Sequence, residues 1–262
     1  MMGVLNVTTD SFSDGGRFAT PAAAAERAVE MAGEGADVID VGGESTRPGS
    51  RPVSEREQIE RVVPVIRQAR QRGVGLPISI DTRSAQVAGV ALDVGADMVN
   101  DVSGARDDPK MPQLLADRGA VFVVMHMQGT PATMQVAPHY EDVVGEVAAF
   151  FEERAAALAA VEIEVAAKML VDPGIGFGKT LEHNLALLGA VGRFGGRWPV
   201  VVGPSRKRFL GEILGETDPA KRVFGTAATV AHAALSGAAM VRVHDVRAMR
   251  QVVEVCDRLC DD

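Results

Sequence analysis

The segment MLVDPGIGFGKTLEHNLALLGAV, residues 169–191, contains one complete unit of the pattern that decides the fold. It begins with a short apolar run that ends in Asp172, continues through a glycine-rich loop, and ends in a helical pattern that follows Thr180. A threonine before a periodic apolar segment is a typical helix start. The segment therefore predicts a strand, a loop and a helix, in that order.

The same order recurs along the whole chain. The apolar runs are GVLNV (3–7), VIDVG (38–42), ISID (78–81), MVNDV (98–102), VFVVMH (121–126), MLVD (169–172), PVVVG (199–203) and MVRVH (240–244). Helical patterns lie between these runs, among them one over residues 219–237. Strands that alternate with helices predict a parallel sheet. A chain of 262 residues also fits a (β/α)₈ barrel of roughly 250 residues. We predict an α/β fold, a TIM barrel, with a doubly wound open sheet as the alternative. Because no linker or shift in composition interrupts the pattern, we expect residues 1–262 to form a single domain.

Composition and charge restrict the class of protein. Apolar residues make up 47% of the chain and aromatic residues only 4%, as expected for a core of aliphatic parallel strands. The net charge of 27 − 35 = −8 disfavours nucleic acid or a membrane surface as a partner, although it permits a local anion site. The two cysteines, Cys256 and Cys260, form neither a disulfide framework nor a zinc pattern. With no signal sequence and no membrane-length apolar run, the sequence predicts a cytoplasmic protein.

Polar side chains follow almost every predicted strand at its carboxyl end. They are Asn6, Asp40, Asp81, Asn100, Asp101, His126, Asp172, Ser205, Arg206, Lys207, Arg242 and His244. One such aspartate is often only a turn former, and one histidine is often a core residue. Active sites of β/α barrels lie at this end of the strands. The repetition therefore predicts one site at the mouth of the barrel.

The polar residues divide into two kinds of chemistry. Aspartate and asparagine side chains suit a flat heterocycle rich in N–H groups, since a carboxylate can accept two parallel hydrogen bonds. Arginine and histidine side chains suit phosphate oxygens, and barrel phosphate sites often lie beside the last two strands. Two glycine-rich loops, TTDSFSDGGRFATP after the first strand and GGESTRPGSRPVS after the second, are interpreted as lids that close on a substrate.

The glycines of the opening segment, at positions 174, 176 and 178, fit neither nucleotide phosphate-loop pattern. We interpret them as positions where the backbone passes close to a ligand. Lys179 and Thr180 are interpreted as the start of the next helix.

Sequence blocks across the chain resemble one family. They are GVLNVTTDSFSDGG, DVGGESTRPG, SIDT, MVNDVSG, MHMQGTP, VDPGIGFGK, GPSRKRFLG and RVHDV. In this order they resemble the dihydropteroate synthases, which are pterin-binding barrels. The resemblance implies the condensation of 6-hydroxymethyl-7,8-dihydropterin diphosphate with 4-aminobenzoate, a step of folate biosynthesis that sulfonamides inhibit. It also implies Mg²⁺ with the diphosphate and a homodimer formed through the helices around the last strand.

The resemblance also implies roles for individual residues. The catalytic residues would be Asp81, Asp172, Lys207, Arg242 and His244. Pterin would contact Thr46, Asp81, Asn100, Met125, Asp172 and Lys207. Diphosphate would contact Asn6, which also faces the metal, and Arg47, Arg242 and His244. Aminobenzoate would contact Phe12, Pro48, Phe177 and Ser205, with Asp10 and Asp14 in loop closure. Because loss of diphosphate makes the pterin methylene electrophilic, we predict no covalent enzyme intermediate.

Two other functions stay open at this point. A pterin barrel that transfers a methyl group to a corrinoid protein would share the Asp and Asn pattern, but it would not need the basic residues of the last two strands. A pterin-binding paralogue without activity would keep the barrel. Release of diphosphate distinguishes both from a synthase.

Overall fold

The structure is a computed structural model that describes residues 1–7, 20–45, 50 and 52–260. Its strands are β1 (Met2–Asn6), β2 (Val38–Gly42), β3 (Ile78–Asp81), β4 (Met98–Asp101), β5 (Val121–Met125), β6 (Met169–Asp172), β7 (Val201–Val202) and β8 (Met240–Val243). They pair in parallel in the order β6-β5-β4-β3-β2-β1-β8-β7. A parallel bridge between Val171 and Val200 joins the two ends of this order. The predicted (β/α)₈ barrel is therefore confirmed.

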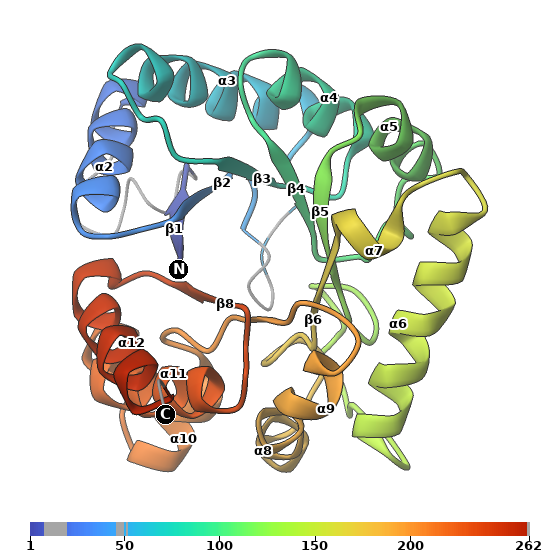
Figure 1. The fold of residues 1–262 in the computed structure, drawn as a ribbon, viewed down its shortest axis with the longest axis vertical. Helices are drawn as coiled ribbons and strands as arrows, with labels where there is room; N and C mark the ends of the chain where they lie inside the picture. Colours follow the sequence, from blue (N-terminus) through green and yellow to red (C-terminus); the bar gives the residue numbers. More distant parts are fainter. Residues whose placement is uncertain (8–19, 46–49, 51, 261–262) are drawn as a thin grey trace.

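Helices surround the strands (Figure 1). They are α2 (Pro21–Gly33), α3 (Glu55–Gln71), α4 (Ala85–Asp93), α5 (Met111–Arg118), α6 (Val143–Ala159), α7 (Val165–Lys168), α8 (Leu181–Gly189), α9 (Val191–Gly195), α10 (Arg208–Leu214), the 3₁₀ helix η1 (Pro219–Lys221), α11 (Val223–Leu235) and α12 (Val246–Cys260). In the described parts of the chain, none of them is long and apolar enough to cross a membrane.

The alternation of side chains along each strand separates the interior of the barrel from its outer face. Outward side chains, such as those of Ile39 and Phe122, pack in the main core, which the surrounding helices share (Figure 1). Inward side chains at one end form a small apolar cluster made of Met2, Val38, Met98, Val123 and Val201. At the other end the strand register aligns Asn6 with Gly42, Gly42 with Asp81, and Asp81 with Asn100. The register therefore gathers the polar strand ends at one mouth.

The structure differs from the sequence prediction in the last third of the barrel. Strand β7 contains only two residues, where a run of five was predicted. The helix expected over residues 219–237 is divided into η1 and α11 at Arg222. Pro219 begins η1 and Asp218 caps it by accepting from the amide of Ala220 at 2.9 Å. The guanidinium of Arg222 donates to the carbonyl groups of Arg206 and Lys207, so a local cap and a tertiary contact coincide with the break between η1 and α11.

Candidate functional site

A buried charge network crosses the mouth between β2, β3, β4 and β8. Nε of Arg242 lies 2.6 Å from Oδ2 of Asp40, and its Nη2 lies 2.8 Å from Oδ2 of Asp81. The amide of Asn100 donates to the same Oδ2 of Asp40 at 3.1 Å. Because Asp40 is fully buried, this carboxylate fixes both Arg242 and Asn100. Two of the predicted pterin contacts, Asp81 and Asn100, therefore belong to one network.

Asp172 and Lys207 both lie next to Gly203, beside this network. A Cβ at position 203 would lie 3.7 Å from Nζ of Lys207, 3.9 Å from Oδ2 of Asp172 and 3.7 Å from Cβ of Arg242. A side chain at position 203 would therefore occupy the space between the carboxylate and the ammonium group. The other carboxylate oxygen of Asp172 accepts from the amide of Gly174 at 2.7 Å, which orients the carboxylate toward Lys207.

Phe177 forms one wall of the mouth. Its ring packs against a cluster of Val102, Met125, Met127 and Met134. The ammonium group of Lys207 lies 4.7 Å from the centroid of the Phe177 ring, a distance typical of a cation–π contact. The structure therefore places the predicted residues Met125, Phe177 and Lys207 next to one another.

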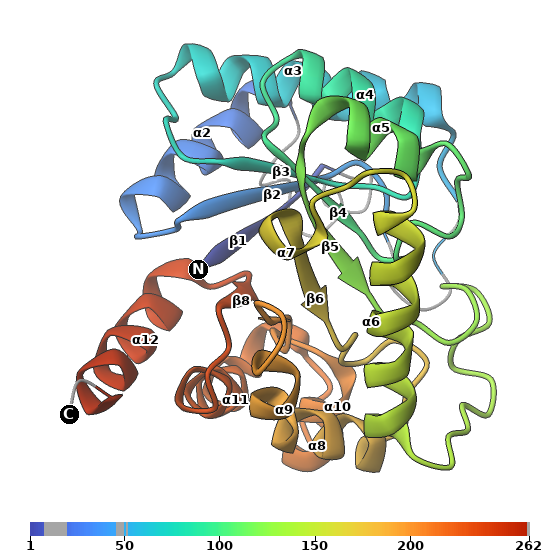
Figure 2. The same cartoon turned by 45° about the vertical axis from the view of Figure 1, so that its right-hand side comes forward.

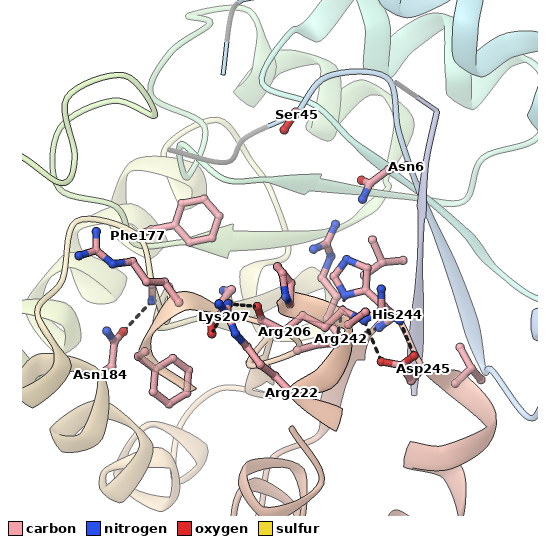
Figure 3. Close-up of a pocket in the computed structure, with 18 of the residues that line it drawn as sticks. Asn6, Ser45, Phe177, Asn184, Arg206, Lys207, Arg222, Arg242, His244 and Asp245 are labelled. Atoms are coloured by element: carbon pink, nitrogen blue, oxygen red, sulfur yellow. Dashed lines mark hydrogen bonds and ion pairs between the residues drawn. The ribbon is translucent and has the colours of Figure 1, made fainter. Parts of the chain in front are cut away.

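Several contacts fasten the loop after β7 to the end of β8. Oγ of Ser205 accepts from the amide of His244 at 3.1 Å and lies 3.0 Å from its Nδ1. Arg206 makes a bidentate ion pair with Asp245, from Nε to Oδ2 at 3.0 Å and from Nη2 to Oδ1 at 2.5 Å. Figure 3 shows Lys207, Arg242 and His244 grouped on one side of the pocket, with Asn6 and Phe177 facing them.

Burial shifts the protonation of the groups at the mouth. Burial raises the pKa of Asp81 to about 7, although Arg242 opposes this shift and Asp40 adds to it. Burial also raises the pKa of Asp172, against the attraction of Lys207. The pKa of Lys207 falls to about 8 because burial outweighs the attraction of Asp172. Asp81 and Lys207 therefore change their charge near neutral pH, which is typical of functional sites.

The remaining predicted residues are placed only in part. Phe12, Asp10, Asp14, Thr46, Arg47 and Pro48 lie outside the described residues. Asn6 ends β1. A Cβ on Gly42 would lie 3.7 Å from Oδ1 of Asn6 and 3.5 Å from Cβ of Asp81, so Asn6 lies near the network.

The described residues contain no group of three or more His, Cys, Asp or Glu side chains that could hold a metal ion. A single carboxamide oxygen fits Mg²⁺ that is held mainly by phosphate and water, as is usual for this ion.

Three residues of this site were not assigned by the sequence prediction. Asp40 was noted only as a polar strand residue, yet it is the centre of the network. Lys179 was interpreted as the start of a helix, but α8 begins at Leu181 with Thr180 as its cap, and the Lys179 side chain is buried. That interpretation is correct for Thr180 and wrong for Lys179. Arg222 donates to the carbonyl groups of Arg206 and Lys207. Sequence spacing carries no signal for these contacts.

The barrel and its paired carboxylates and cations define a class, a (β/α)₈-barrel enzyme whose mouth receives a polar, charged small molecule. The profile of the pterin binding enzyme family matches residues 2–244. A dihydropteroate synthase of Synechocystis is 47% identical over 99% of this chain and 89% of its own length. The dihydropteroate synthase of Yersinia pestis, solved with a sulfonamide drug, has a TM-score of 0.94 at 39% identity and covers 100% of this chain and 94% of its own.

A further solved structure is similar over the same extent. The dihydropteroate synthase of Xanthomonas albilineans with 4-aminobenzoic acid has a TM-score of 0.92 at 42% identity, and the alignment covers 100% of this chain and 93% of that one. The chain belongs to the pterin binding enzyme family, and within it to the dihydropteroate synthases.

Proposed function

We propose that the protein condenses 6-hydroxymethyl-7,8-dihydropterin diphosphate with 4-aminobenzoate and releases 7,8-dihydropteroate and diphosphate. The observation that carries this proposal is that the Asp172 carboxylate and the Lys207 ammonium group both lie next to Gly203, one strand away from Arg242. That arrangement supplies hydrogen-bond acceptors for a ring and positive charge for a leaving group within one mouth.

The pterin ring would lie over the carboxylates of Asp81 and Asp172. Both are buried acceptors, and N–H groups along the edge of a pterin would donate to them. Asn100 is held by Asp40 and offers its carboxamide oxygen to the same ring. The contact between Lys207 and the Phe177 ring would close one side of this pocket.

The reaction would break the C–O bond between the pterin methylene and the diphosphate, which leaves with the bonding electron pair. The amine nitrogen of 4-aminobenzoate then forms the new C–N bond and releases one proton. An aromatic amine is a weak nucleophile, so the methylene must carry positive charge in the transition state. The carboxylates of Asp81 and Asp172 would stabilise that charge. No side chain is needed as a nucleophile, and we propose no covalent intermediate.

The diphosphate would lie toward Asn6, Arg242 and His244, with Arg47 as a further expected contact. The carboxylates of Asp40 and Asp81 engage Nε and Nη2 of Arg242, so we expect its Nη1 to donate to a phosphate oxygen. Mg²⁺, when bound with the diphosphate at Asn6, supplies positive charge beside the leaving oxygen. The protein's own part is to orient the phosphates and neutralise their charge.

4-Aminobenzoate would bind between Phe177 and Ser205. The Phe177 ring offers an apolar wall for the benzoate ring, and the loop that carries Ser205 is held by His244. Because sulfonamides have the same outline as 4-aminobenzoate, we expect them to compete for this pocket.

We also propose that the protein is a homodimer in the cytoplasm. Helices α11 and α12 lie side by side on the outside of the barrel (Figures 1 and 2). They expose large apolar side chains, with Phe224 84% exposed and Leu235, Val255 and Leu259 at least half exposed. A surface of this kind on neighbouring helices supports pairing with a second copy.

The test is to measure diphosphate release and dihydropteroate formation from the pterin diphosphate, with and without 4-aminobenzoate. We expect release to depend on the amine and product to form in equal amount. Pterin binding without diphosphate release would instead support a binding protein. Methyl transfer from methyltetrahydrofolate to a corrinoid protein would support the methyltransferase.

A further inference from the structure

Lys179 is a buried lysine directly behind the pterin site. Its side chain is 4% exposed. Its Nζ donates to the carbonyl oxygens of Phe177 at 2.9 Å and His126 at 3.3 Å, and it lies 3.1 Å from Nδ1 of His126. These contacts join the loop after β6 to the end of β5. In the described part of the chain, the last backbone hydrogen bond between the two segments is the one from His126 to Asp172.

The three acceptors match the three hydrogen atoms of one ammonium group. Burial, together with the nearby charges of Lys179 and Arg106, lowers the pKa of His126 to about 3, so its ring is neutral. An ammonium group can only donate, so beside the charged form of Lys179 Nδ1 accepts and the ring proton lies on Nε2. Burial lowers the pKa of Lys179 to about 7, although Asp172 opposes this shift. The ammonium form has a partner for every hydrogen.

The glycines of the loop show how closely it lies against β5. Gly174 has φ +68°, and a Cβ there would lie 1.9 Å from the carbonyl oxygen of His126. Gly178 has φ +62°, and a Cβ there would lie 2.6 Å from the carbonyl oxygen of Gln128. Side chains at these positions are excluded by the backbone of residues 126–128. In the described part of the chain, Lys179 fastens the loop to the carbonyl group of His126, and side-chain hydrogen bonds from the β5–α6 connection hold it further along.

The opposite side of the same loop carries groups of the site. The carbonyl oxygen of Ile175 accepts from Nζ of Lys207, and the Phe177 ring lies 4.7 Å below that ammonium group. The loop is thus held from behind by one lysine and contacted from the mouth by another. Displacement of its backbone would move Phe177 and the acceptor of Lys207 together.

We propose that Lys179 is a positioning residue for the synthase reaction, which sets the place of Phe177 and of the Lys207 ammonium group by fastening residues 174–177 to His126. Because it is buried, it would act through this loop and not through contact with a substrate. The inference rests on the proposed function for its kinetic consequence, but not for its structural one.

The experiment compares Lys179→Met, which keeps the length of the side chain but removes the donors, with Ile66→Ala. Ile66 is fully buried in α3, on the other side of the barrel from α8 (Figure 1). Both variants should lower the melting temperature. At a temperature where both are folded, we expect kcat/KM for 4-aminobenzoate to fall about 10- to 100-fold in Lys179→Met and to stay at the wild-type value in Ile66→Ala. Amide hydrogen exchange of residues 174–179 should rise only in Lys179→Met.

Lys179→Gln retains a donor and should recover part of both losses, and it serves as the test if Lys179→Met does not fold. A double variant with Phe177→Ala should lose less than the sum of the two single losses, since both changes act on the same wall. The proposal is overturned if Lys179→Met changes only the melting temperature, as Ile66→Ala does, or if Lys179→Gln does so where Lys179→Met does not fold. If the wild-type protein forms no dihydropteroate, the proposed function fails, and hydrogen exchange still decides whether Lys179 holds the loop.

Discussion

Arg242 lies 2.6 Å from Asp40, a residue 202 positions away in the chain, and this contact fixes the charge at the mouth of the barrel. The same guanidinium reaches Asp81 at 2.8 Å. One cation therefore pairs with two buried carboxylates, and Asp81 shares Arg242 with Asp40 in the ligand-free protein.

Arg242→Met should destabilise the protein in a pH-dependent way. The variant leaves Asp40 and Asp81 without their cation, and breaking a buried ion pair typically costs about 3 kcal/mol. Protonation relieves unpaired carboxylates, so the loss in free energy of unfolding should be larger at pH 8 than at pH 5. Urea unfolding at both values measures this difference. The same loss at both pH values would show that Arg242 does not hold the two carboxylates.

In binding assays Arg242→Met should lose more affinity for the pterin diphosphate than for a bare pterin, and equal losses would contradict the contact of Arg242 with phosphate.

Asp172→Asn should weaken pterin binding about 10- to 100-fold, the equivalent of about 1.5–3 kcal/mol for a hydrogen bond to a charged group. The substitution keeps the shape and the bond from the amide of Gly174, but it removes the charge that N–H groups of the pterin would face. Isothermal titration with a bare pterin gives the measurement. Asp37, a half-exposed carboxylate on the surface, provides the control, since Asp37→Asn should keep the wild-type affinity.

Pterin affinity should fall as the pH falls below about 7. The pKa of Asp81 in the free protein is about 7 because of burial, and a ligand that donates to the carboxylate binds the ionised form. Below the pKa a proton must first leave, which costs about tenfold in affinity for each pH unit. Titrations from pH 5.5 to 8.5 would show the slope. Asp81→Asn should bind more weakly and lose this part of the slope, and an unchanged slope would assign the titration to another group.

The raised pKa of Asp81 also makes the free energy of unfolding depend on pH. Its folded pKa of about 7 is above the ordinary value of 3.8. The folded state therefore binds the extra proton between these values. The contribution of Asp81 to stability is greatest below about pH 4 and is lost as the pH rises to 7. In urea unfolding, Asp81→Asn should remove this decline, with the other titrating groups unchanged.

Gly174→Ala should lower the free energy of unfolding by at least about 2 kcal/mol. A Cβ at this position would overlap the carbonyl oxygen of His126, and the backbone there has φ +68°. Gly33 is the control, because a Cβ there meets nothing within 4 Å, and Gly33→Ala in α2 should stabilise the protein by about 0.5 kcal/mol. Chemical denaturation measures both. A neutral Gly174→Ala would mean that the loop can leave β5 at little cost.

Phe224→Glu should convert the proposed dimer to a monomer, since it places a charge in the apolar surface of α11. Val136→Glu is the matched control, because Val136 is 77% exposed but lies between β5 and α6, away from α11. Sedimentation velocity distinguishes the two. A wild-type protein that sediments as a monomer would refute the dimer.

The sequence by itself determined the barrel and several of the polar residues at its mouth. Local rules were sufficient for this, because each strand is a short apolar run and several helices begin at a capping residue such as Thr180. Parallel strands of a barrel carry their carboxyl ends at one mouth, so the order of the chain was enough to predict that Asp81, Asn100 and Asp172 belong to one site. The family resemblance added the chemistry of the ligand.

Only the tertiary structure decided which of these groups pair. Asp40 holds Arg242 across the interior, Lys179 is buried against His126, and Arg222 divides the predicted helix at residue 222. No local signal distinguishes a buried lysine from one that begins an exposed helix, since both follow a glycine-rich loop. The difference arises from the packing of the loop after β6 against residues 126–128. Such contacts join distant parts of the chain, and their energy depends on burial, which exists only once the barrel has closed.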